Sequence, residues 1–64
     1  MLVPFKELES GNTVFVNPER VVAIFIAVDE KHKGKTVINL TNGNLLTDVD
    51  QLEAVGLING ALNG

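Results

Sequence analysis

Two short β-prone runs joined by Asn42-Gly43 constrain the fold of this chain more than any other feature. A two-residue type I′ turn needs a positive φ at both central positions, and Asn-Gly tolerates that conformation best. The turn predicts a hairpin of fixed register in which Leu40 lies opposite Leu45. Ile38 then lies opposite Thr47, and these side chains share a mostly apolar face. The register matters, because a slip of one residue would exchange the two faces of each strand.

A run of eight apolar residues, 21–28, precedes the hairpin and is apolar on both alternating sets. A strand of this kind is normally covered on both faces, and the run is too short and too rich in β-branched residues to favour a helix. One cover comes from the chain itself, and we expect a second subunit to supply the other. Phe25 is the leading contact, since small residues on either side allow close approach. The predicted oligomer interface consists of Val21, Ala23, Phe25 and Ala27.

Turn signals divide the rest of the chain into short elements. Residues 1–8 form an extended lead-in, and residues 13–17 are rich in β-branched side chains, which is typical of a strand. Asp50 is the expected N-cap of a helix, with Glu53 three residues later as in a capping box. Leu52, Val55 and Ile58 are expected to share one face of this helix, which is expected to end at Asn59-Gly60 and to leave a frayed tail over residues 59–64.

The predicted fold class is mostly β, with a four- to five-stranded antiparallel meander or small open barrel and one short C-terminal helix. Sixty-four residues allow a single domain over positions 1–64. So short a chain usually needs stabilisation beyond its own core, from disulfides, a bound metal or a partner chain. The absence of Cys excludes disulfides and thiolate metal sites, and one His excludes a multi-histidine site. Self-association is the remaining source of additional stability.

The charge balance and the apolar pattern limit the possible partners. A net charge of −3 argues against a protein that binds nucleic acid over its whole surface. The start of the chain lacks the pattern of a secretory leader, and no apolar run approaches the about 20 residues of a membrane span. We therefore expect a cytoplasmic protein with no membrane partner.

Four pieces of the chain together match one known pattern: Val16-Asn17, residues 21–24, the segment 36–43 that ends in Leu-Thr-Asn-Gly, and residues 52–55. In these pieces the chain resembles the flagellar FlbD-like family of small bacterial proteins. The resemblance implies a β-strand, a turn anchored by Asn, further strands and a short acidic helix. The family brings no catalytic residues to this chain.

A basic cluster lies in the loop between residues 29 and 35. The predicted contact residues for nucleic acid or another partner are Lys31, His32, Lys33 and Lys35. A loop of this kind contacts phosphate when its field is repeated around an oligomer, whereas by itself it keeps a strand edge soluble. No aromatic residue interleaves with the lysines, so the base-stacking half of a single-strand site is missing.

The remaining polar residues have structural roles that do not require a catalytic or metal site. Asp50 and Glu53 are accounted for by helix capping, and Asp48 lies on the polar face of the hairpin, so we expect no metal site. His32 lies among lysines without a partner for acid–base work, and Ser10 has no adjacent base. We therefore expect no catalytic residues, no cofactor and no enzyme activity.

Together these features predict a small oligomeric binding or regulatory module that acts through protein–protein contacts, as accessory or phage-type proteins do. Its partners are expected to be copies of itself and another protein. The alternative is a ring-like homo-oligomer that binds RNA or DNA through the basic loop.

Overall fold

The computed structural model describes residues 1–64 and consists of five strands, one 3₁₀ turn and one C-terminal helix. The elements are β1 (Val3–Lys6), β2 (Thr13–Val16), η1 (Pro18–Arg20), β3 (Val21–Ile26), β4 (Thr36–Leu40), β5 (Gly43–Thr47) and α1 (Gln51–Asn63). The predicted class, mostly β with a helix at the C-terminal side, is confirmed. The helix is 13 residues long, and the chain has no helix of the length and apolar character that a bilayer requires.

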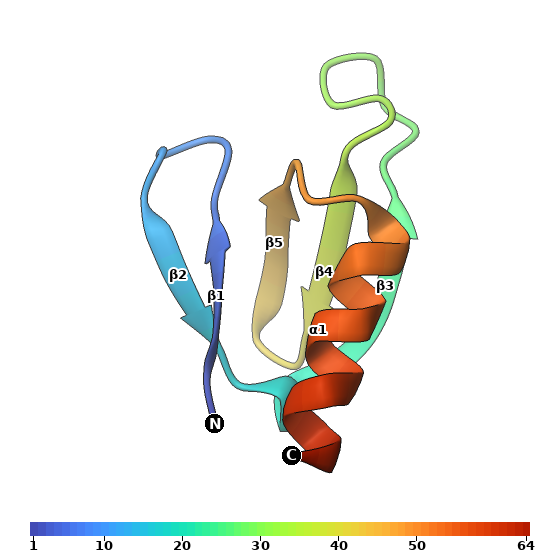
Figure 1. Ribbon diagram of the computed structural model, residues 1–64. Coiled ribbons are helices and arrows are strands. Elements are labelled where there is room, and N and C mark those ends of the chain that lie inside the picture. The colour runs from blue at the N-terminus through green and yellow to red at the C-terminus, as the bar shows by residue number, and fades with distance from the viewer.

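The five strands form two antiparallel sheets rather than one meander. One sheet pairs β1 with β2, and the other has the order β3-β4-β5. Figure 1 shows β1 beside β5, where the backbone N–H of Leu8 donates to the carbonyl of Leu46 at 3.0 Å. No ladder of hydrogen bonds runs between the two sheets, so the strands do not close into a barrel.

The core lies between one face of each sheet and one side of α1. Helix α1 contacts β1, β3 and η1, so it bridges the two sheets and covers the space between them (Figure 1). The buried side chains of this cluster are Val3, Phe5, Val16, Ile38, Leu45, Ala54 and Ile58. Apolar contact across both sheets and the helix therefore holds the fold together.

The β4–β5 hairpin forms, but its turn lies one residue earlier than predicted, which shifts the cross-strand partner of each residue by two positions. Leu40 pairs with Gly43 and Ile38 with Leu45, so the loop consists of Thr41 and Asn42. Neither loop residue has a positive φ, whereas Gly43 has a φ of 150°. The expected type I′ turn at Asn42-Gly43 and the pairing of Leu40 with Leu45 are therefore wrong. A shift of two residues preserves the faces, and Ile38 and Leu45 still point into the core.

Tertiary contacts set this turn. The N–H of Thr41 donates to the carbonyl of Arg20 at 3.1 Å, which extends the bonding of β4 beyond the start of β3. Gly43 takes a positive φ, which residues with a side chain rarely adopt, and Asn42 therefore does not need a positive φ in this turn.

Helix α1 begins as predicted and ends later. The carboxylate of Asp50 accepts a hydrogen bond from the N–H of Leu52 at 3.1 Å, so Asp50 is the N-cap. The expected stop at Asn59-Gly60 is wrong, because the helix continues to Asn63 with Ala61 packed against the core. Leu52 is 78% exposed, and the buried helical residues are Ala54 and Ile58. Of the residues expected on one face, Ile58 is therefore buried and Val55 half-buried, whereas Leu52 is exposed.

Candidate functional site

A β-bulge near the start of β3 decides which side chains reach the outer surface. Val21 pairs with Leu40 and Ala23 with Asn39, so Val22 is an extra residue without a partner in the ladder. The extra residue turns Val21 to the core face, where it packs against the buried cluster. The expectation that Val21 shares a face with Ala23 is therefore wrong, because simple alternation does not cross a bulge.

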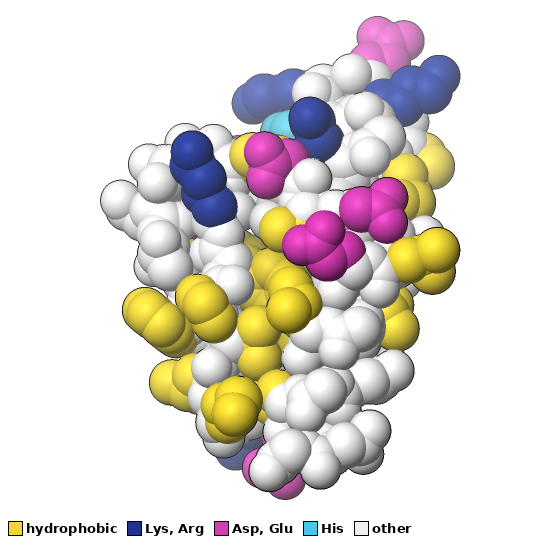
Figure 2. All heavy atoms as spheres, viewed as in Figure 1, with side chains coloured by type: hydrophobic (Ala, Val, Ile, Leu, Met, Phe, Trp, Pro, Cys, Tyr) yellow, Lys and Arg dark blue, Asp and Glu magenta, His cyan; other side chains and the backbone are white.

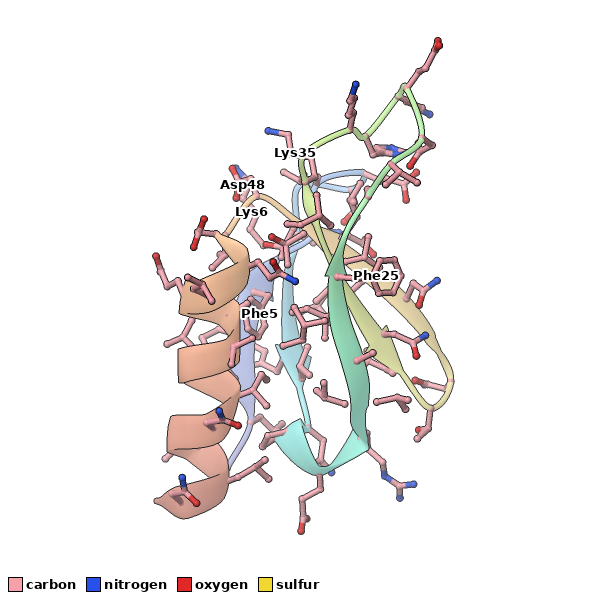
Figure 3. All side chains as sticks on the ribbon, turned by 90° about the vertical axis from the view of Figure 1, so that its right-hand side faces the viewer. Phe5, Lys6, Phe25, Lys35 and Asp48 are labelled. Carbon is pink, nitrogen blue, oxygen red and sulfur yellow. The ribbon has the colours of Figure 1, made fainter.

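The outer face of the three-stranded sheet carries Phe25 on its edge strand, β3. Phe25 pairs with Val37, which pairs with Leu46, so these apolar side chains form one row across the sheet. Phe25 is 44% exposed and projects from β3 on the side away from α1 (Figure 3). Ala23 is exposed on the same face, so the structure brings together two of the four residues predicted for an interface.

Ala27 lies just beyond β3 and is buried. Its N–H donates to the carbonyl of Lys35 at 2.8 Å, and its carbonyl accepts from the N–H of Gly34 at 3.1 Å. These bonds close the loop of residues 29–35 onto the end of β3. Ala27 therefore supports the loop and contributes little side-chain surface.

The outer edge of β3 has no neighbouring strand. Because residue 27 exchanges hydrogen bonds with the chain of β4, the alternation of an antiparallel ladder directs the N–H and C=O of Ile24 and Ile26 away from β4. Figure 3 looks onto this edge, with α1 on one side and Phe25 on the other. One group is occupied, since the Nε2 of Gln51 donates to the carbonyl of Ile24 at 3.1 Å.

The basic loop is ordered around Asp29. Its carboxylate lies 3.0 Å from the Nδ1 of His32 and also accepts a hydrogen bond from the His32 N–H at 3.2 Å. The side chains of Lys31, Lys33 and Lys35 are exposed. The loop therefore exposes its lysines to solvent, while the His32 ring lies against the carboxylate of Asp29.

A hollow of about 300 Å³ lies where this loop approaches the turn after β1. Its lining combines apolar and charged side chains: Leu8, Glu9, Lys31, His32 and Leu46. A second hollow of about 270 Å³ lies at the other side of the molecule, lined by Val14, Phe15, Val16, Asn17, Arg20, Leu40 and Asn42. Neither hollow holds a group of three or more metal-ligating side chains.

Lys6 lies at the same end of the molecule as the basic loop (Figure 3), and the sequence pattern did not reveal it. Lys6 is exposed on β1 because it alternates with buried Phe5, and Figure 3 places it with Lys35 and Asp48 at one end of the molecule. Figure 2 shows lysine and carboxylate side chains intermingled at that end. The field there is mixed in sign and not uniformly positive.

The polar residues considered for chemistry stay apart. Asp50 is engaged as the helix cap, and the Ser10 hydroxyl donates to the carboxylate of Glu7 at 2.7 Å. Asp48, Asp50 and Glu53 do not form a group that could hold a metal ion. No buried side-chain nitrogen or oxygen lacks a hydrogen-bond partner, so the interior offers no unsatisfied polar group to a ligand.

The chain matches no protein-family model, no curated protein and no solved structure. The resemblance to the flagellar FlbD-like family stays a prediction from the sequence.

Proposed function

We propose that this protein is a non-enzymatic oligomeric module that binds other proteins and regulates them, in the manner of accessory or phage-type proteins of the cytoplasm. The observation that carries the proposal is the open edge of β3, with Phe25 exposed beside it. Large apolar side chains next to an unpaired strand edge favour association with another chain. The FlbD-like resemblance of the strands and the acidic helix is compatible with such a role.

In this proposal the two sheets and α1 act as a small open barrel around the core, and the outer edge of β3 has no neighbouring strand. Assembly uses Ala23 and Phe25, and Val21 supports them from the core side. The loop with Lys31 and His32, or the acidic start of α1, then meets the partner protein. Assembly and partner binding therefore use different parts of the surface.

Two measurements test the proposal. Sedimentation over a concentration series should give a mass well above the 6.9 kDa of one chain, and a monomer at every concentration contradicts it. Affinity capture from native lysate should enrich a protein that is lost when Lys31, Lys33 and Lys35 are replaced with Ala. A partner kept by that triple variant points to another surface.

The second candidate function is binding of RNA or DNA by a ring-like homo-oligomer. It is favoured by the position of Lys6, which adds a fourth lysine to the end that carries the basic loop. The interspersed carboxylates weaken the field, so this candidate ranks below protein binding. Binding should fall steeply as salt rises, and undetectable binding at low salt excludes it.

A further inference from the structure

We propose that β3 pairs antiparallel with β3 of a second copy of this chain, around a two-fold axis at Phe25. The pairing joins two three-stranded sheets into one sheet of six strands. This inference rests on the proposed function, because it specifies how the oligomer forms. It predicts a closed dimer instead of a ring.

The backbone of β3 supplies the hydrogen bonds for this pairing. Ile24 and Ile26 both direct N–H and C=O groups outward, and antiparallel strands exchange such groups in pairs. The strand lacks two of the devices that protect an edge, since residues 21–28 contain neither a charge nor a proline. Its bulge lies at Val22, near one end, and leaves the edge from residue 23 onward regular.

Side-chain sizes fit a two-fold axis at Phe25. In this register Ile24 lies opposite Ile26 of the second copy, and the two Phe25 rings face each other in the closely spaced pair between them. Ala23 lies opposite Ala27 of the second copy, so small side chains flank the ring pair on both sides. Aromatic pairs of this kind are favourable cross-strand contacts.

The charges at the ends of β3 select the antiparallel arrangement. Arg20 precedes the strand, and Asp29 and Glu30 follow it. When two copies run in opposite directions, Arg20 of each lies near Glu30 of the other, so both ends bring opposite charges together. Glu30 has no partner within the chain, since the one ion pair of the molecule joins Asp29 with His32.

The other open edge fits less well. Strand β2 has four residues, against six in β3, and asparagine, not a charged residue, lies directly before and after it. Pairing β3 with β2 of the next copy produces a head-to-tail chain or ring, which lacks the charge match. A mass above that of a dimer is the outcome expected from that arrangement.

Gln51 acts as a competitor for the dimer. Its side chain donates to the Ile24 carbonyl at 3.1 Å, which is the group that accepts from the Ile26 N–H of the second copy. Dimerisation therefore displaces two Gln51 side chains, one from each copy. Because each displaced bond opposes association, Gln51→Ala should raise the association constant on the order of tenfold.

The test uses two opposite charges at position 25. Phe25→Lys and Phe25→Glu should each sediment as a monomer, because identical charges then face each other across the axis, whereas an equal mixture should form a dimer. Leu52→Lys, which places the same charge on an exposed helical position, should leave the wild-type dimer intact. Far-UV circular dichroism verifies that each variant is folded.

Hydrogen exchange on the wild-type protein tests the same edge without a substitution. The amides of Ile24 and Ile26 should become protected as concentration rises, while the amide of Val37, which already bonds within the sheet, serves as the internal control. An oligomer in which these two amides stay unprotected, or in which the mixed variants do not associate, overturns the β3 pairing and leaves the proposed function standing. A wild-type monomer at every concentration overturns both.

Discussion

The docking of α1 depends on Ile58, and replacing it with Ala gives the sharpest test of the fold. Ile58 is 4% exposed and lies in the buried cluster with Ala54. The substitution removes three buried carbon groups, which at about 0.8 kcal/mol each amounts to about 2.4 kcal/mol. Because an unfilled cavity adds to this loss, we expect a decrease of about 3 kcal/mol in the free energy of unfolding.

That loss is large for a chain of this size. A domain of 64 residues has a total free energy of unfolding of about 3 to 10 kcal/mol at the usual values per residue. Ile58→Ala therefore removes about a third of the stability or more. Leu52→Ala is the matched control on the same helix, since Leu52 is 78% exposed and its truncation should cost less than about 0.5 kcal/mol.

Urea unfolding at a fixed protein concentration measures both variants. Far-UV circular dichroism is the suitable signal, because the chain has neither Trp nor Tyr. With a slope of about 1 kcal/mol/M for a small domain, the midpoint of Ile58→Ala should fall by about 3 M, or the variant should be unfolded without urea. An equal loss in Leu52→Ala would mean that α1 docks through its other face, which refutes the assignment of the core.

Three further substitutions test local features. Gly43→Ala should destabilise by about 1–2 kcal/mol in the same urea assay, because Gly43 has a φ of 150°, whereas Gly56→Ala, at a helical site with open space around it, should stabilise by about 0.5–1 kcal/mol. Thr36→Val should cost about 1–3 kcal/mol, since the buried Thr36 hydroxyl donates to the carbonyl of Val49 at 2.6 Å. Thermal unfolding that ranks Gly43→Ala above the wild type, or leaves Thr36→Val unchanged, contradicts these assignments.

The features that the sequence predicts correctly are those decided by neighbouring residues. Asp50 caps α1 because its carboxylate reaches an N–H two residues away, and this geometry needs no tertiary contact. The faces of the hairpin are also correct, since alternation places Ile38 and Leu45 together whichever two-residue loop joins them.

Features decided at long range escape the sequence pattern. The bulge at Val22 cannot be recognised in the sequence, because every neighbouring residue is also apolar. The pattern of alternating residues therefore does not predict that Val21 faces the core. The inward face of α1 is set by its packing against the sheets, which buries Ala54 and Ile58 and leaves Leu52 exposed.

The candidate site shows the same division. The lysines of the loop are adjacent in the chain and are therefore found together, but Lys6 reaches the same end of the molecule only through the pairing of β1 with β2. The contact of Gln51 with the Ile24 carbonyl spans 27 residues. Nothing in the local sequence around Gln51 marks it as a side chain that covers a strand edge.

Because β1 and β2 form a sheet of their own, the β1–β2 hairpin can unfold locally as one unit. Packing of side chains such as Phe5 and Val16, with the bond from Leu8 to Leu46, holds it against the rest. We expect such a unit to detach by sub-global unfolding before the whole chain melts. The vacated place fits the same hairpin of another molecule, with the short segment through η1 as the hinge, so crowded solutions favour a domain-swapped exchange. In native-state hydrogen exchange, amides of β1 and β2 should therefore open at lower denaturant than those of β4.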